Sequence, residues 1–257
     1  MPCISSVLAQ KYRSFEILVI DDASSDNTAE LVESISSTTI DIRCIRLPTN
    51  SGTPARPRNV GVMNARYEVI AFLDADDAWD SCHLEMSLRT MRDFSCHFVT
   101  SCVLASNSAA HIFKRCPPTG TVISLRSLLW SNSVVTSSVV VDIRQIPVGL
   151  AFPEKFNIYE DYAQWLTLAA EIPLRSTGHQ TTLYSRSGLN KMSLIRSRRL
   201  KSTYNTFRHF FSRVNNRSIT ELIVLTLIAL LSISRLFIGE LLRNVKITVK
   251  TVTRIKR

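Results

Sequence analysis

The chain has 257 residues, of which 45% are hydrophobic, so it can form a substantial core and is not a disordered protein. Its formal net charge is +10, but residues 1–185 carry 15 Lys and Arg against 19 Asp and Glu, whereas residues 186–257 carry 16 against 2. Because this basicity is confined to one end and no motif for reading bases accompanies it, we expect no nucleic-acid partner.

The first predicted strand is short, apolar and rich in β-branched residues, and it runs from Phe15 to Ile20. Such a run is typical of a buried parallel strand. It ends at Asp21 and Asp22, and residues 24–27 then supply turn and N-cap chemistry for a helix that reaches about residue 35. The acid pair is therefore interpreted either as helix capping or as a binding site.

A second strand is predicted over residues 42–47, a short helix over 59–65 and a third strand over 69–73, which also ends in carboxylates. Right-handed crossovers place such strands in one parallel sheet, and α/β sheets bind ligands beyond the carboxyl ends of their strands. We therefore expect both acid clusters at the same edge of one sheet.

Weaker patterns follow along the rest of the chain. They predict helices at 83–91, 125–130 and 162–170, and strands at 98–104 and 137–141. Glu160 and Asp161 come directly before the last of these helices. Their carboxylates serve either in catalysis or in compensating the positive end of the helix dipole.

Three carboxylates, Asp74, Asp76 and Asp77, fall within four residues at the end of the third strand. Their mutual repulsion requires a cation or hydrogen-bond donors. Residues two apart in an extended chain point the same way, so Asp74 and Asp76 are able to share a ligand. Hard oxygen ligands suit Mn²⁺ or Mg²⁺, and the alternative is a solvated turn.

The six cysteines form no C-x-x-C pair, and the first residues do not have the pattern of a signal peptide. We interpret them as ordinary thiols in a reducing cytoplasm. Cysteines and histidines are frequent between residues 82 and 116, but their spacing matches no standard zinc site.

Four segments occur in an order that resembles family 2 glycosyltransferases of the GT-A fold: residues 5–11, 15–28, 50–61 and 71–79. The resemblance runs through most of residues 5–193. It implies an α/β fold with a Rossmann-like, mostly parallel sheet flanked by helices, with residues 1–205 as the GT-A domain and 206–257 as a basic helical extension. It also implies inverting transfer of a sugar from a nucleotide-diphosphate sugar. The Gln-x-x-Arg-Trp motif of processive synthases is absent, so transfer of a single sugar is expected.

The resemblance also implies roles for the donor side. Asp22, or Asp21 beside it, would contact the base, and Asp74 would face the ribose. Asp76, with Asp74, would bind the Mn²⁺ or Mg²⁺ ion. Further members of the implied donor site, which hold the nucleotide loop or lie near the diphosphate, are Arg58, Asn59, Tyr184, Arg186 and Ser193.

On the acceptor side, the resemblance places an acidic pair at the start of a helix, here Glu160 and Asp161. An inverting displacement needs a base that removes the proton of the acceptor hydroxyl. We assign that role to Asp161 and an orienting role to Glu160.

The chain departs from the family pattern in two places. The family's first strand should lie about 25 residues before Ser5 and is missing, which suggests that Met1 is an internal codon or that the gene product is truncated; Arg66 stands where Gly is common. A catalytically inactive scaffold is therefore the alternative function. A signalling receiver domain fits less well, because it needs a single acceptor Asp and a Lys at a later strand end.

The C-terminal segment from Ile219 to Leu242 is largely apolar, but its uncharged part, residues 222–234, is shorter than the roughly 20 residues that cross a bilayer. An apolar helix flanked by cations suits the surface of an anionic membrane. The alternative is a helix packed on the catalytic domain or on a partner. We expect a cytoplasmic enzyme, peripheral on the cytoplasmic face of the inner membrane, with a glycan or lipid-linked acceptor of bacterial surface-polysaccharide synthesis.

Overall fold

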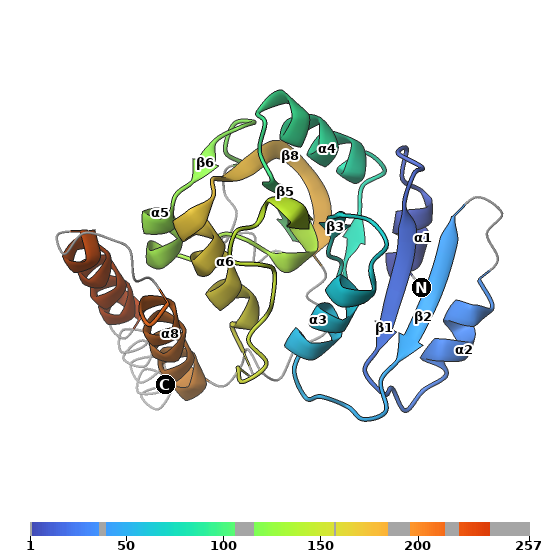
Figure 1. Cartoon of the computed structure of the whole chain (residues 1–257), viewed down its shortest axis with the longest axis horizontal. Helices are drawn as coiled ribbons and strands as arrows, with labels where there is room; N and C mark the ends of the chain where they lie inside the picture. The colour runs from blue at the N-terminus through green and yellow to red at the C-terminus, as the bar shows by residue number, and fades with distance from the viewer. Residues whose placement is uncertain are drawn as a thin grey trace, which may run out of the picture.

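The computed structural model describes residues 2–35, 40–105, 116–156, 158–184, 196–213 and 221–236. Helices surround two separate β-sheets, and the smaller sheet lies at the opposite end of the molecule from the C-terminal helices (Figure 1). The α/β class expected from the sequence is confirmed.

The smaller sheet consists of β1 (Glu16–Asp21) and β2 (Asp41–Arg46), which pair in parallel from Glu16 opposite Asp41 to Asp21 opposite Arg46. Helix α2 (Thr28–Glu33) makes the crossover between them. Its Val32 packs with Ile4, Ile17 and Ile40 in a small core of its own. This unit places Asp21 at the carboxyl end of β1, as its apolar run predicts.

The larger sheet has the order β3-β7-β5-β8-β4, and β6 also pairs with β8. Strands β5 and β8 pair in parallel, while β7 is antiparallel to both β3 and β5, so β3, β5 and β8 share one direction. β4 and β6 are antiparallel to β8. The strands are β3 (Val69–Ala71), β4 (Ala78–Trp79), β5 (Phe98–Ala105), β6 (Val122–Ile123), β7 (Val139–Asp142) and β8 (Leu174–Tyr184).

The expectation that the first three strands share one sheet is wrong. Among the described residues, the pairing partner of β1 is β2 and that of β3 is β7, and no strand joins β1 to β3. A sheet is continuous only where neighbouring strands exchange backbone hydrogen bonds, and these two strands do not. Helix α3 (Ala55–Asn64) instead packs on β1, where Gly61 lies against Ile20.

The main core is built around Trp165, which is fully buried on α6 (Glu160–Glu171). The centre of its ring lies 5.3 Å from the ring centre of Phe98 of β5 and 5.5 Å from that of Phe152. The ring centres of Phe152 and Phe72 are 5.4 Å apart, and the ring planes are steeply inclined in all three pairs. Such edge-to-face packing is favourable beyond the area that it buries. It anchors α6 and so fixes the position of the helix start, where Glu160 and Asp161 lie.

Several local predictions are close. Helix α5 (Leu125–Trp130) has the expected bounds, and α4 (His83–Asp93) extends two residues further than expected. Helix α3 begins four residues earlier than predicted, at Ala55 after Pro54. Strand β8, the longest in the structure's described part, was not predicted, because its Thr-rich sequence lacks a strong apolar alternation.

The C-terminal helices pack on the main core. The division expected after residue 205 falls inside α8 (Arg196–Phe211), whose Phe207 and Phe210 are buried together with Leu225 and Ala229 of the helical residues 221–236. One face of the apolar segment is therefore packed on the domain, which agrees with the alternative that the sequence left open to a membrane-surface helix. In the described part of the chain, no helix is long and apolar enough to cross a membrane.

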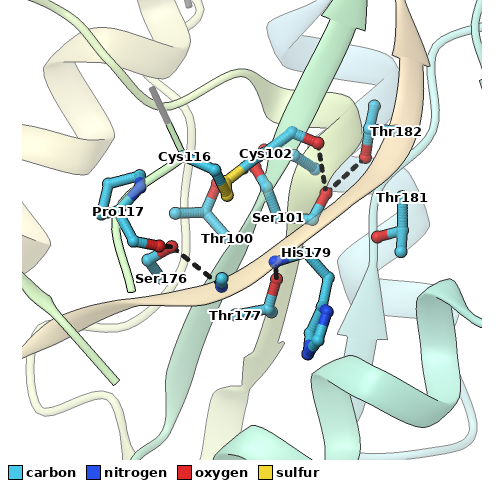
Figure 2. The surroundings of a disulfide bond; sticks show 12 residues. Thr100, Ser101, Cys102, Cys116, Pro117, Ser176, Thr177, His179, Thr181 and Thr182 are labelled. Carbon is cyan, nitrogen blue, oxygen red and sulfur yellow. Dashed lines mark hydrogen bonds between the residues drawn. A yellow bond between two sulfur atoms is a disulfide. The ribbon is translucent and has the colours of Figure 1, made fainter. Parts of the chain in front are cut away.

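Two cysteines are not the free thiols that the sequence suggested. Cys102 of β5 forms a disulfide with Cys116, and their Cα atoms lie 5.6 Å apart (Figure 2). The segment after Cys116 is held against β8. Ser176 of β8 donates a side-chain hydrogen bond to the carbonyl of Pro117, and its backbone pairs with Gly120 and Thr121. Because β8 also pairs with β5, which carries Cys102, it places Cys116 next to Cys102. Free cysteines in the described residues are Cys3, Cys44, Cys82 and Cys96.

Candidate active site

Arg58 of α3 joins the two predicted halves of the site. Its Nη2 atom lies 2.9 Å from Asp74 Oδ1, and its Nη1 atom lies 2.7 Å from Glu160 Oε1. The guanidinium lies 5.5 Å from the centre of the Phe152 ring, and only 11% of the side chain is exposed. A carboxylate from the end of β3 and one from the start of α6 are thus held by a single buried cation.

Ser137 organises the acidic loop after β3. Its hydroxyl donates to Asp77 Oδ2 at 2.5 Å and accepts from the backbone N–H of Asp74 at 3.1 Å. Its carbonyl accepts from Trp79 Nε1 at 2.6 Å. Asp77 is therefore buried against protein donors, whereas Asp74 and Asp76 remain nearer to the surface. The three carboxylates thus divide into one structural member and two that are available to a ligand.

Asp161 is held beside this group by Thr136, whose hydroxyl donates to Asp161 Oδ2 at 2.8 Å. The other carboxylate oxygen accepts from the backbone N–H of Tyr162. Asp161 is half-buried, and Glu160 is only 5% exposed. Of the two neighbours, Asp161 has the more accessible carboxylate.

Asp21 and Asp22 point to different partners. Asp21 is buried, and hydrogen bonding from Ser24, together with Arg46 at 3.4 Å, lowers its pKa. The carboxylate of Asp22 accepts from the backbone N–H of Ser51 at 3.0 Å and from its hydroxyl at 2.8 Å. Asp22 thus fixes the loop that leads into α3. Among the described residues, the side-chain partners of Asp21 and Asp22 are Ser24, Arg46 and Ser51, which lie at or after the ends of β1 and β2 and not in the acidic loop.

Asn59 fixes a second loop. Its side-chain oxygen accepts from the backbone N–H of Phe152 at 2.7 Å, and its Nδ2 atom donates to the Phe152 carbonyl at 2.9 Å and to Glu154 at 3.0 Å. The residue after Arg58 therefore holds the ring against which Arg58 lies. Arg186 and Ser193 lie outside the described residues, and Tyr184 is the last residue of β8.

The acidic groups perturb one another. Burial and the charge of Asp161 raise the pKa of Glu160 to about 7, against the opposing effect of Arg58. Partial loss of hydration and repulsion from Asp74 raise the pKa of Asp76. Burial would lower the pKa of Arg58, but Asp74, Asp161 and Glu160 raise it above its usual value, so this guanidinium stays charged.

The raised pKa of Glu160 predicts a pH effect on stability. Between its usual pKa of 4.5 and about 7, the folded protein binds this proton more tightly than the unfolded chain, so the free energy of unfolding falls as pH rises. In Glu160→Gln this fall should be smaller by about 3 kcal/mol between pH 4 and 8, since each pKa unit corresponds to about 1.4 kcal/mol. Urea unfolding of both proteins across this range measures the difference, and parallel curves would contradict it.

Three residues contribute to this site without having been predicted from the sequence. Thr136 and Ser137 lie in a short 3₁₀ turn before β7, where a continuous strand over 137–141 was predicted. Cys3 lies on α1 (Pro2–Leu8), where its carbonyl accepts a hydrogen bond from the Ser6 hydroxyl, and that hydroxyl accepts from the backbone N–H of Trp79, just after the acidic loop. Burial and the charges of Asp74, Asp77 and Asp76 raise the pKa of the Cys3 thiol to about 11. A Thr-Ser-Ser run beside apolar residues was the available signal for the first two.

No three Asp, Glu, His or Cys side chains in the described part of the chain are gathered closely enough to hold a metal ion by themselves. Asp74 and Asp76 offer the two carboxylates nearest to the surface in the acidic loop. A cation held here would need further oxygen ligands from a bound molecule.

The sequence matches the family model for glycosyl transferase family 2 over residues 2–137, which is more than half of the chain. The chain belongs to this family. An uncharacterized glycosyltransferase of Haemophilus influenzae is 32% identical to it over 218 residues, which cover 82% of this chain and 81% of that protein.

The Escherichia coli protein WfgD is described as a UDP-Glc:alpha-D-GlcNAc-diphosphoundecaprenol beta-1,3-glucosyltransferase. It is 35% identical over 167 residues, which cover 64% of this chain and 62% of WfgD. The chain therefore matches slightly less than two thirds of that enzyme's length.

Two solved structures share the fold. The TarS 1–349 fragment of Staphylococcus aureus in complex with UDP-GlcNAc has a TM-score of 0.66 at 18% identity, and the match covers 80% of this chain and 61% of that fragment. The mannosyltransferase PcManGT of Pyrobaculum calidifontis, in complex with GDP-Man and Mn²⁺, has a TM-score of 0.61 at 14% identity, with coverage of 92% and 69%. The GT-A fold expected from the sequence is confirmed.

Proposed function

We propose that this glycosyltransferase moves a single sugar, with inversion, from a nucleotide-diphosphate sugar to a lipid-linked acceptor in bacterial surface-polysaccharide synthesis. The observation that carries the proposal is the bridge from Asp74 through Arg58 to Glu160, with Asp161 beside it. It joins the carboxyl end of β3, where donors bind in α/β folds, to the start of an acceptor-side helix.

On the donor side, we assign the base to Asp22 or Asp21 and the ribose to Asp74. Asp22 and Asn59 support these roles indirectly, since each holds a loop flanking Arg58 through hydrogen bonds. The UDP-GlcNAc complex of TarS and the GDP-Man complex of PcManGT are consistent with a nucleotide-sugar donor. Arg186 keeps its proposed role near the diphosphate.

We propose that Asp76 and Asp74 hold Mn²⁺ or Mg²⁺. Asp74 and Asp76 lie two residues apart, and burial together with repulsion from Asp74 raises the pKa of Asp76; a divalent cation would relieve that repulsion. Two carboxylates suit a hard cation whose remaining ligands are diphosphate oxygens and water. When bound, the ion would neutralise charge on the departing nucleoside diphosphate.

On the acceptor side, Asp161 is the general base and Glu160 orients the site. Glu160 is buried and occupied by Arg58 at 2.7 Å, so it has little access to an incoming hydroxyl. Asp161 is half-buried, and Thr136 holds its carboxylate by one oxygen. The other oxygen, already close to the start of α6, would accept the proton as the acceptor oxygen attacks.

The similarity to WfgD, a glucosyltransferase whose name gives a diphosphoundecaprenol acceptor, supports a lipid-linked acceptor for this chain. Such an acceptor lies in a membrane. We therefore propose a peripheral location on the cytoplasmic face of the inner membrane.

The second candidate function is an inactive scaffold, favoured by the separation of β1 from β3. The residues proposed to bind the donor after β1 and after β3 are therefore not held by one continuous sheet. Measuring nucleoside-diphosphate release from a panel of nucleotide sugars, with and without Mn²⁺, separates the two functions. Release that needs an acceptor supports transfer, whereas no release from any donor favours the scaffold.

The metal assignment predicts the effect of Asp76→Asn. This change should weaken Mn²⁺-dependent binding of the donor by on the order of 100-fold, because it removes a charged ligand. Calorimetric titration with UDP-glucose, with and without Mn²⁺, measures the effect. Asp93→Asn, a surface carboxylate at the end of α4, is the matched control and should bind as wild type does. Equal Mn²⁺ dependence in wild type and Asp76→Asn would refute the assignment.

A further inference from the structure

The helical residues 221–236 have two faces of different character. One face is buried in the main core through Leu225 and Ala229, which are 1% and 3% exposed. On the opposite face, the polar residues Thr226 and Ser234 are exposed, and four further exposed side chains are apolar. These are Ile223, Leu227, Leu230 and Leu231, at 55%, 54%, 54% and 59% exposed.

The four exposed residues form one ridge. Their spacing of four, three and one residues places them on the same side of a helix. Isolated exposed leucines are normal on protein surfaces, but a contiguous apolar ridge indicates an interaction surface. The helix lies at the outer end of the molecule beside α8, far from β1 and β2 (Figure 1). The ridge is therefore accessible to a large flat partner.

One end of the ridge carries an aromatic and a cation. The Arg235 guanidinium lies 4.6 Å from the centre of the Trp130 ring and donates to the Trp130 carbonyl at 3.2 Å. Ser232 donates to the same carbonyl at 3.1 Å. Trp130 remains 43% exposed. Indole rings and arginines side by side suit the boundary between lipid headgroups and acyl chains.

We propose that this ridge docks the protein on an anionic lipid surface, with Ile223, Leu227, Leu230 and Leu231 inserted below the headgroups. Charge complementarity selects this partner, because residues 186–257 carry 16 Lys and Arg against 2 Asp and Glu. Binding is parallel to the surface, since the buried face stays packed on the protein. This inference rests on the peripheral location proposed above but not on the transfer chemistry, and it identifies which face of the domain meets the membrane.

The test uses the full chain and vesicles without any substrate, so it does not depend on catalysis. Wild type should sediment with vesicles that contain phosphatidylglycerol, more weakly with pure phosphatidylcholine, and less at high salt. Leu227→Gln combined with Leu231→Gln should weaken binding to the anionic vesicles by roughly tenfold or more. Both positions are exposed, so thermal melting should stay close to that of wild type.

The matched control replaces two exposed apolar residues elsewhere, Met63→Gln with Val148→Gln, at 74% and 45% exposed. It should bind vesicles as wild type does. A second readout is intrinsic tryptophan fluorescence. Trp79 and Trp165 are buried, with 6% and 0% of their surface exposed, so a blue shift on vesicle binding reports on Trp130. Trp130→Phe should abolish that shift.

Three results would overturn the proposal. Wild type that fails to sediment with anionic vesicles has no such surface. If the variant with Leu227→Gln and Leu231→Gln binds anionic vesicles as tightly as wild type, the basic residues alone account for the lipid binding and the ridge does not take part. If wild type is a dimer in light scattering and does not bind vesicles, and the double variant is a monomer, then a second copy of the chain covers the ridge.

Discussion

Replacing Asp161 by Asn should lower kcat by about 10²–10⁴-fold, the usual contribution of a general base. Asn has the same shape, and its side-chain oxygen still accepts from Thr136, which lies 2.8 Å from Asp161 Oδ2. It takes up no proton at the pH of the assay. Affinity for the donor should therefore stay within a fewfold of wild type, measured by titration, while turnover with acceptor collapses.

Two companion variants sharpen this test. Glu171→Gln, an exposed carboxylate at the far end of the same helix, should keep full turnover. Glu160→Gln should lower turnover less than Asp161→Asn, because Glu160 orients Arg58 rather than accepting the proton. If Glu160→Gln alone abolishes turnover and Asp161→Asn is active, the two roles are exchanged.

Arg58→Met should destabilise the fold by about 3–5 kcal/mol at pH 8, because it leaves the buried Glu160 carboxylate without its counterion. The methionine side chain keeps apolar contact with Phe152, so the lost charge dominates the effect. The cost should be smaller at pH 6. Burial and Asp161 raise the pKa of Glu160 to about 7 in the presence of Arg58, and loss of Arg58 raises this pKa further, so at pH 6 Glu160 is increasingly protonated in both proteins and needs no partner. Urea unfolding at both pH values measures the difference.

The control for that variant is Arg66→Met. Arg66 pairs with Asp41 at the surface, where its side chain is 58% exposed, so the change should cost no more than about 1 kcal/mol. Adding Glu160→Gln to Arg58→Met should recover part of the lost stability, since the unpaired charge is then gone. An equal loss in Arg58→Met and Arg66→Met, or the same loss at pH 6 and pH 8, would contradict the buried bridge.

The sequence by itself determined the local structure and the family. Apolar runs ending in carboxylates identified β1 and β3, and a weaker pattern predicted α5 with the bounds that the structure has. The order of four short segments was enough to identify the glycosyltransferase family, which the family model confirms. These features depend on residues close in sequence, whose propensities and spacing can be read directly.

Only the tertiary structure decided which of these residues meet. Arg58 reaches Asp74 and Glu160, the latter 102 residues away in sequence, and Ser137 reaches Asp77 across 60. The separate β1–β2 sheet, the Cys102–Cys116 disulfide and the exposed ridge of residues 221–236 likewise come from packing. The physical reason is that contacts between distant segments depend on how whole elements bury their apolar faces together, which no local pattern specifies.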